Sequence, residues 1–194
     1  MNETFFKISI AVLVVLFIAE RIPFVRKTKK VKKTVRKSPA RERVMVLTNW
    51  FGMVFFPFIY AFSRVFDGLS MGIHDYLRIG GIAVYVFALV LLFLSHKGLH
   101  ENWSMGLEIG EEHKLINTGI YSKIRHPMYT AFMLMMAGQL FIVSNWFVGM
   151  FGVCVWVLLL ILRTSDEEKM LIEEFGDEYR EYMKKTKMFI PYIF

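Results

Sequence analysis

Long stretches without a charged residue dominate this sequence. The longest runs from Pro127 to Leu162, 36 residues that contain no Asp, Glu, Lys or Arg. Residues 4–19, 44–63 and 77–95 are also apolar, apart from one basic residue in each of the first and third. About 20 apolar residues form a helix that crosses roughly 30 Å of hydrocarbon. The chain is therefore predicted to be an integral membrane protein.

Composition excludes the main alternatives. Hydrophobic residues make up 55% of the chain, more than in a disordered or ordinary soluble protein. The single cysteine, Cys154, excludes an intrachain disulfide framework. The first apolar run follows no basic segment, which favours a permanent span over a cleaved signal peptide.

The 36-residue run is too long for one span, and its only polar pair, Ser144-Asn145, lies at its midpoint. We expect two antiparallel helices there, with a tight turn whose backbone groups are shielded by neighbouring protein. Pro57 should kink the second span. The predicted fold is an all-α membrane protein, a single domain over residues 1–194, with a C-terminal tail (164–194) of cytosolic helices that close a pocket. The five predicted spans are residues 4–20, 44–63, 77–96, 127–143 and 146–163.

Residues 21–43 carry eleven Lys and Arg against one acid, Glu42, and so account for the chain's positive charge. A short basic loop beside a span marks the cytoplasmic side, which places the N-terminus outside and the C-terminus inside. Anionic lipid headgroups are the expected partners of this loop. No aromatic residue follows Phe24 among these cations, which argues against nucleic acid.

Most candidate chemical groups fall on the predicted cytoplasmic side. His96 and His100 have a spacing that can hold a metal, but five histidines are too few for a membrane di-iron enzyme. We therefore expect no metal at these histidines. They are instead expected to be polar side chains at a helix end, where they meet the membrane interface.

The segment Tyr121–Tyr129 precedes and begins the fourth predicted span. Pro127 suits the first helical position, where N–H groups and the helix dipole favour a ligand carboxylate. The same residues can also be explained without a ligand. Arg125 and His126 would then anchor the chain at the membrane interface, and the tyrosines would belong to an aromatic belt.

Arg163 and Glu167 are four residues apart at the end of the fifth span and share a helix face. They could form a surface ion pair or bind a zwitterion. The tail beyond them has a helical repeat of large apolar and aromatic residues interrupted near Gly176. It is predicted to be an amphipathic helix or helix pair that lies on the membrane or folds over the site.

Three segments in this order resemble a known family: HKLINTGIYSKIRHPMY (113–129), the apolar hairpin, and RTSDEEKMLIEEFGDEYREYMKKTKMFIP (163–191). Together they resemble the isoprenylcysteine carboxyl methyltransferases and, more broadly, membrane methyltransferases that include phospholipid N-methyltransferases. The resemblance covers about the C-terminal half. It implies S-adenosylmethionine as methyl donor, S-adenosylhomocysteine as product, and a prenylated cysteine that enters from the lipid side as acceptor.

The resemblance also implies roles for individual residues. Arg163 and Glu167 would be catalytic, with Arg163 facing the acceptor and Glu167 also binding a polar part of the cofactor. The remaining cofactor-binding positions would be His113, Lys114, Leu115, Ile116, Tyr121, His126, Pro127, Met128 and Tyr129.

Three other functions stay open at this point. A lipid amine acceptor such as phosphatidylethanolamine would need a base, for which Glu167 or His126 could serve. Membrane sterol reductases have a similar C-terminal pocket but use NADPH. A membrane scaffold without catalytic activity would bind neither S-adenosylmethionine nor NADPH.

Overall fold

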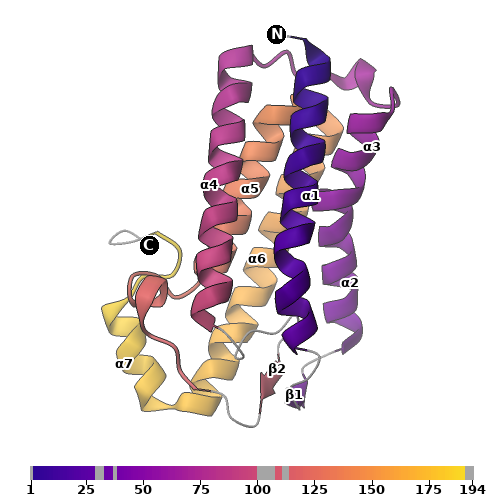
Figure 1. The fold of residues 1–194 in the computed structure, drawn as a ribbon. Helices are drawn as coiled ribbons and strands as arrows, with labels where there is room; N and C mark the ends of the chain where they lie inside the picture. The colour runs from indigo at the N-terminus through magenta and orange to yellow at the C-terminus, as the bar shows by residue number, and fades with distance from the viewer. Residues whose placement is uncertain (1, 29–32, 37–38, 100–107, 111–113, 191–194) are drawn as a thin grey trace.

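The computed structural model describes residues 2–28, 33–36, 39–99, 108–110 and 114–190 as a bundle of long helices that run side by side (Figure 1). Within these residues, four helical stretches are long and apolar enough to cross a membrane, and a fifth apolar helix is somewhat shorter. The chain is thus a multi-pass integral membrane protein. The bundle helices are α1 (Glu3–Thr28), α2 (Pro39–Trp50), α3 (Phe56–Phe62), α4 (Asp75–Leu99), α5 (Pro127–Val143) and α6 (Trp146–Phe175).

The two ends of the bundle differ in structure. At one end, which we call the N-terminal end, α1 begins and a loop with a 3₁₀ turn, η2 (Asp67–Leu69), joins α3 to α4 (Figure 1). The other end carries the last helix, α7 (Asp177–Lys185), and we call it the α7 end. α1 and α4 both finish at the α7 end.

The second predicted span is one helical stretch with an irregular turn in its middle. A π-helical segment, Phe51–Phe55, joins α2 to α3 and ends two residues before Pro57. Proline has no N–H for the helical ladder, so the hydrogen bonds before it must rearrange. A π-helical turn is one such rearrangement, and the irregularity expected at Pro57 takes this form.

α5 and α6 form the predicted antiparallel hairpin, and the rest of the protein encloses its turn. Ser144 has a left-handed φ of 46°, and Asn145 caps α6 by accepting a hydrogen bond from the Val148 N–H at 3.1 Å. The Ser144 hydroxyl accepts from the Ile73 N–H at 2.9 Å. The Asn145 side-chain amide donates to the Phe66 carbonyl at 2.7 Å. Both turn residues are 2% exposed, so the expected shielding is confirmed.

α4 and α5 approach each other closely at a pair of glycines. A Cβ atom at Gly81 would lie 2.8 Å from the Cβ of Phe141 and 2.9 Å from the carbonyl oxygen of Gly138. A Cβ atom at Gly138 would lie 2.8 Å from the carbonyl oxygen of Gly81. Neither position therefore accommodates a side chain. At the neighbouring Gly80, a Cβ would meet nothing within 4 Å.

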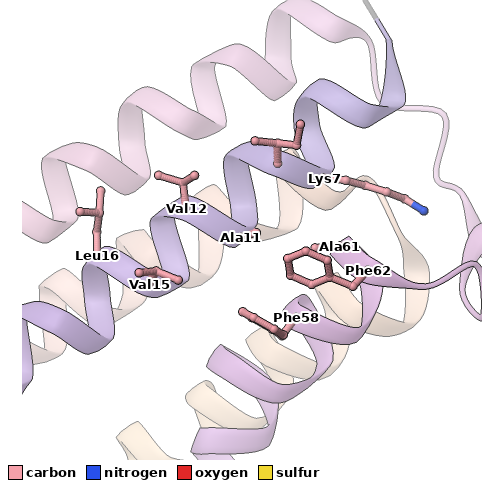
Figure 2. Close-up of a pocket in the computed structure, with 9 residues that line it drawn as sticks. Lys7, Ala11, Val12, Val15, Leu16, Phe58, Ala61 and Phe62 are labelled. Atoms are coloured by element: carbon pink, nitrogen blue, oxygen red, sulfur yellow. The ribbon is translucent and has the colours of Figure 1, made fainter.

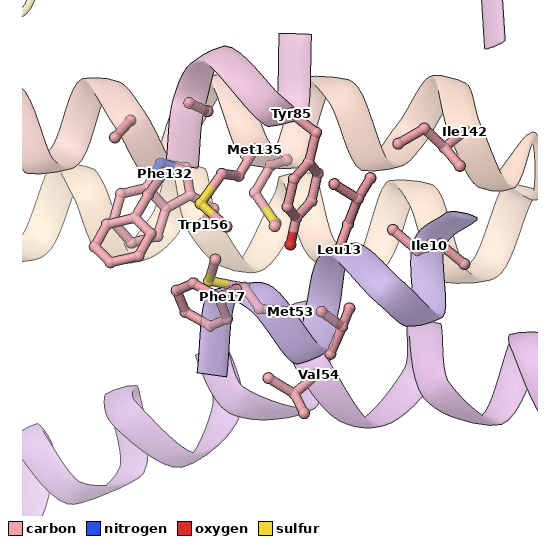
Figure 3. Close-up of a cluster of buried hydrophobic side chains, with 14 of the residues drawn as sticks. Ile10, Leu13, Phe17, Met53, Val54, Tyr85, Phe132, Met135, Ile142 and Trp156 are labelled. Atoms are coloured by element: carbon pink, nitrogen blue, oxygen red, sulfur yellow. The ribbon is translucent and has the colours of Figure 1, made fainter. Parts of the chain in front are cut away.

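The interior of the bundle is a continuous apolar core to which α1, α4, α5, α6 and the π-helical segment contribute. Figure 3 shows side chains from these elements converging, among them Phe17, Met53, Tyr85, Phe132 and Trp156. Because α5 and α6 are anchored in this core, the residues at their α7 ends have fixed positions.

The fold is helical as predicted, and at the α7 end it also contains a short two-stranded antiparallel sheet that was not predicted. β1 (Lys33–Arg36) pairs with β2 (Glu108–Gly110), with Lys33 opposite Gly110 and Arg36 opposite Glu108. The two strands belong to loops that follow α1 and α4. Since both helices finish at the same end, their loops can pair although they are far apart in sequence.

The C-terminal tail is continuous with the last membrane helix. α6 extends to Phe175, past the predicted end of the span at residue 163, and Gly176 ends it with a φ of 55°. Glycine adopts this backbone conformation without strain. α7 starts directly afterwards, and its Tyr179 and Tyr182 are buried. The break near Gly176 is confirmed, and α7 packs on the protein.

Candidate functional site

The segment that precedes α5 contacts the part of α6 that follows the predicted span. The Arg125 side chain donates from Nε to Glu168 Oε1 at 2.9 Å, and His126 Nε2 lies 3.4 Å from the same oxygen. His126 Nδ1 is 3.9 Å from Glu167 Oε1. The two motifs that the sequence singled out are therefore in direct contact.

Tyr129 adds a second link between the two helices. Its hydroxyl donates a hydrogen bond to Glu167 Oε2, and its ring stacks on His126 with the ring centroids 5.3 Å apart. The Glu168 side chain is 13% exposed and held by Arg125, whereas that of Glu167 is 28% exposed. Glu167 is the more accessible carboxylate of the pair.

The chain after α7 covers the start of α5. We call residues 186–189 the tail segment. The Arg125 N–H donates to the Lys187 carbonyl at 2.8 Å, and the His126 N–H donates to the Met188 carbonyl at 3.0 Å. The Arg125 guanidinium also donates to the carbonyl of Thr186, the first residue of the tail segment. The tail segment thus fixes the backbone that positions His126.

Tyr121 links the site region to α4 and α7. Its hydroxyl donates to the Ser95 carbonyl at 3.3 Å, and its own carbonyl accepts from the Tyr182 hydroxyl. Burial raises the pKa of Tyr121 well above its ordinary value and raises that of Tyr182 to about 12. The Tyr121 hydroxyl is therefore directed into the protein, and the cofactor role predicted for this residue stays a prediction.

The other predicted cofactor positions are described only in part. His113 lies outside the described residues. Lys114 is exposed, whereas Leu115 and Ile116 are half-buried in the segment that leads to a 3₁₀ turn, η4 (Gly119–Ser122). Their roles stay predictions. Pro127 and Met128 begin α5, with Pro127 buried and Met128 half-buried against the core.

Arg163 lies one turn before Glu167 on α6, as predicted, and its Nε atom is buried. A second arginine, Arg21 of α1, lies near the same end of the bundle. The Arg21 guanidinium carbon lies 5.5 Å from the Phe17 ring centroid and 5.6 Å from that of Phe132. From the sequence, Arg21 was predicted only to be one of the cations of the basic segment 21–43. Its spacing of four residues from Phe17 was a signal that the two share a helix face.

The prediction for His96 is wrong, because its side chain does not meet the membrane interface. It is fully buried, stacks on Phe24 with the ring centroids 4.6 Å apart, and places Nδ1 3.5 Å from Glu20 Oε1. α1 and α4 lie side by side here, so the inner face of α4 meets protein and not lipid. His100 is outside the described residues, and the described residues contain no group of three or more possible metal ligands.

An apolar groove lies at a different place, between α1 and α3 (Figure 2). It has a volume of about 360 Å³, and Lys7 lies at its N-terminal end, where it pairs with Asp67 at 2.8 Å. The groove is formed by outward-facing residues of the two helices. It is separate from the contact between Tyr129 and Glu167.

Together these elements define a class of protein: a helical membrane protein in which an Arg-His-Pro-x-Tyr segment at the start of one membrane helix meets an acidic pair of the next helix, just beyond its predicted span. Residues 81–173 match the model of the isoprenylcysteine carboxyl methyltransferase (ICMT) family. The match covers 93 of the 194 residues, just under half of the chain.

Two curated proteins of the same name are each similar to part of this chain. The protein-S-isoprenylcysteine O-methyltransferase of Schizosaccharomyces pombe is 35% identical over 85 residues, which cover 43% of this chain and 35% of the relative. The human enzyme of the same name is 30% identical over 121 residues, which cover 61% of this chain and 42% of the relative. The matches thus span well under half of these curated relatives.

A solved structure shares the fold. The eukaryotic intramembrane Ras methyltransferase ICMT superposes with a TM-score of 0.54 and 22% sequence identity, over 82% of this chain and 55% of that one. The shared fold extends beyond the family match, which leaves α1, α2, α3 and α7 outside it.

Proposed function

We propose that this protein transfers a methyl group from S-adenosylmethionine to the α-carboxylate of a prenylated cysteine. The observation that carries the proposal is the hydrogen bond from Tyr129 to Glu167, which joins two family motifs within the matched residues 81–173. The family name and the names of the S. pombe and human relatives supply the chemistry.

We further propose that the site works on the cytoplasmic side of a membrane that the chain crosses five times. The basic segment 21–43 begins in the last two turns of α1, at the α7 end, and clustered Lys and Arg favour the cytoplasm. The N-terminus is then outside. Residues 164–194 form the cytosolic part that closes the pocket.

The residues present fit the proposed methyl donor. S-adenosylmethionine carries a cationic sulfonium and a cationic ammonium group, and Glu167 offers an accessible carboxylate beside the stacked rings of His126 and Tyr129. When bound, the donor supplies an electrophilic methyl group. In this proposal Glu167 binds a cationic part of it, and the remaining binding positions are His113, Lys114, Leu115, Ile116, Tyr121, His126, Pro127, Met128 and Tyr129.

The acceptor needs orientation more than activation. A carboxylate with a pKa near 4 is already ionised at neutral pH, so no general base is required. Arg163, one turn from Glu167, holds the carboxylate in line with the methyl group. α7 and the tail segment keep water out, which favours the neutralisation of opposite charges during transfer. The prenyl chain lies in lipid and enters between α5 and α6.

Methyl transfer to two acceptors tests the proposal. The purified protein in lipid nanodiscs is given S-adenosylmethionine with a labelled methyl group, and either a farnesylated cysteine or phosphatidylethanolamine. We expect base-labile label on the cysteine compound and none on the lipid. Label on the lipid amine would instead support a phospholipid N-methyltransferase. Calorimetry should show binding of S-adenosylhomocysteine; a preference for NADPH would contradict the proposal.

Arg163→Ala tests the role of the acceptor-facing cation. We expect methyl transfer to fall at least 100-fold, because the carboxylate is no longer oriented, while the affinity for S-adenosylhomocysteine changes less than threefold. Arg180→Ala is the matched control, since Arg180 is an exposed arginine on α7 that pairs with Asp177. Undiminished transfer by Arg163→Ala would remove Arg163 from the mechanism.

A further inference from the structure

We infer that the apolar groove between α1 and α3 binds one acyl chain of a zwitterionic phospholipid, whose headgroup contacts Lys7 and Asp67. The groove lies along the first half of α1, toward the N-terminal end of the bundle (Figure 2). It is thus away from the contact between Tyr129 and Glu167. The bound lipid is a ligand distinct from the methyl acceptor, and the inference does not depend on the proposed function.

The dimensions of the groove fit a single hydrocarbon chain. Its lining on α1 runs from Lys7 to Leu16, nine residues that rise about 14 Å. This length is close to half of the hydrocarbon core, which is roughly 30 Å thick. A volume of about 360 Å³ over this length corresponds to a cross-section of roughly 25 Å². A helix with its side chains is about 10–12 Å across, so it is too wide to enter.

The lining is apolar and open to the surroundings of the bundle. Eight of the nine lining side chains are apolar. Ile8 and Val12 of α1 and Phe62 of α3 are 51–71% exposed, so in a membrane they face lipid hydrocarbon. Ala11 and Ala61 are the smallest side chains of the lining, and their size leaves the space between the two helices. A chain in this groove contacts protein on two sides, which increases its dispersion contacts relative to a flat surface.

The N-terminal end of the groove carries one charge of each sign. The Lys7 ammonium donates to Asp67 Oδ1 at 2.8 Å and to the carbonyl of Ser63, the first residue after α3, at 3.1 Å. Its nitrogen also lies 5.2 Å from the Tyr60 ring centroid. An ammonium has three N–H donors, and these are its two hydrogen-bond acceptors among the residues that the structure describes. The third N–H suits a phosphate oxygen.

The position of this pair corresponds to the depth of lipid headgroups. Figure 2 shows Lys7 at one end of the groove, with its amino group directed away from the apolar side chains. α3 gives way to a loop at Ser63, and lipid-exposed loops do not occur within the hydrocarbon. The Asp67 side chain is 47% exposed, so its carboxylate is accessible to a lipid ammonium group.

Lys7 and Asp67 together carry no net charge, which favours a headgroup with one charge of each sign. In the proposed contact the lipid phosphate accepts from Lys7, and the lipid ammonium donates to the carboxylate of Asp67. An anionic headgroup has no cation for Asp67 and is repelled by it. The basic segment 21–43 at the α7 end, by contrast, suits anionic lipids.

Photo-crosslinking in nanodiscs tests the inference. Phosphatidylethanolamine or phosphatidylglycerol with a diazirine in one acyl chain is incorporated in trace amounts, and labelled peptides are located by mass spectrometry. In wild type we expect phosphatidylethanolamine to label residues 8–16 and 58–62 at least fivefold more than phosphatidylglycerol does. Ala61→Phe fills the groove and should reduce the labelling of α1 at least fivefold. Val90→Phe, at an exposed position of α4, is the matched control and should behave as wild type.

Charge variants test the headgroup contact. Lys7→Met should reduce labelling of the groove by phosphatidylethanolamine at least fivefold. Lys27→Met, at an exposed lysine near the other end of α1, is the control and should not. Asp67→Asn leaves the cation alone, so phosphatidylglycerol should then label the groove at least as strongly as phosphatidylethanolamine.

Three results would overturn the inference. Equal labelling of wild type by both lipids would mean that the groove holds bulk lipid only, and this comparison does not depend on the folding of any variant. Full labelling of Lys7→Met would remove the headgroup contact. Crosslinks between two protein copies at residues 8–16 or 58–62 would show that a second copy occupies the groove.

Discussion

Glu167 and Glu168 are neighbours in sequence and have different surroundings. Glu168 receives a hydrogen bond from Arg125 at 2.9 Å and lies beside His126, so both of its partners belong to the segment ahead of α5. Glu167 is bonded by Tyr129 and is about twice as exposed. Adjacent helical residues point in directions about 100° apart, which explains how one carboxylate holds the fold while the other remains accessible.

Replacing each glutamate by glutamine should separate these roles. We expect Glu168→Gln to lower the free energy of unfolding by about 1.5–3 kcal/mol, because Arg125 loses its charged partner in a largely buried site. Glu167→Gln should cost less than about 1 kcal/mol and weaken S-adenosylmethionine binding at least tenfold. Thermal unfolding in detergent and calorimetry measure the two quantities. The reverse pattern would contradict the assignment.

Contacts between elements determine how precisely the site is held. α4 and α5 pack backbone to backbone at Gly81 and Gly138. α7 and the tail segment are tied to the loop ahead of α5 through backbone carbonyls. α5, which carries Tyr129, is therefore fixed at both its middle and its beginning.

Substitution of two adjacent glycines tests the α4–α5 contact. In Gly81→Ala the new methyl group would overlap α5, and we expect a loss of about 1–3 kcal/mol in stability. In Gly80→Ala the new methyl group meets nothing within 4 Å, so stability should stay the same or rise by up to about 1 kcal/mol through helix propensity. Unfolding temperatures in detergent compare the two, and equal values would contradict the close approach.

The packing of α7 on the rest of the protein should weaken at alkaline pH. Tyrosine has an ordinary pKa of about 10, and burial raises that of Tyr182 to about 12 in the folded protein. The stabilisation linked to the neutral hydroxyl is fully present below pH about 10 and is lost as the pH rises through about 12. Tyrosinate absorbance and proteolysis of α7 should change together in this range.

Two phenylalanine variants control this titration. Tyr182→Phe removes the ionisable group and its hydrogen bond to the Tyr121 carbonyl, so proteolysis of α7 should already increase at neutral pH. Tyr76→Phe, at an exposed tyrosine of α4, should leave the alkaline transition unchanged. An α7 that stays protected at every pH would contradict this explanation.

The whole molecule is an asymmetric bundle, with the site, the sheet and α7 at one end. The opposite end is closed by ion pairs, such as Arg78 with Glu3 at 2.7 Å. This asymmetry suits a protein that receives a water-soluble donor from one side and an apolar acceptor from the membrane.

Cysteine labelling tests the proposed orientation. In a Cys154→Ser background, Ser70→Cys places a thiol in the exposed loop at the N-terminal end, and Lys185→Cys places one on exposed α7. In intact cells an impermeant maleimide should label position 70 and not position 185, which should react only after permeabilisation. The opposite labelling pattern would reverse the proposed topology.

Much of the candidate site could be predicted from local sequence. Pro127, Tyr129, Arg163 and Glu167 occur in short motifs. The structure places the first two in the first turn of α5 and the other two in α6, at and just beyond the predicted end of the span. The turn at Ser144 was predictable for the same reason, because polar residues within an apolar run have to leave the hydrocarbon or be enclosed by protein.

The sequence by itself determined the membrane class, the helical hairpin and the residues that meet at its base, because apolar runs, turn residues and motif spacing act over short distances. Only the tertiary structure decided that His96 is buried, that two loops pair as strands, and that Arg21 turns toward the α5 core. These features depend on which helix faces become neighbours. That choice is made by packing between segments far apart in the chain, and no local pattern encodes it.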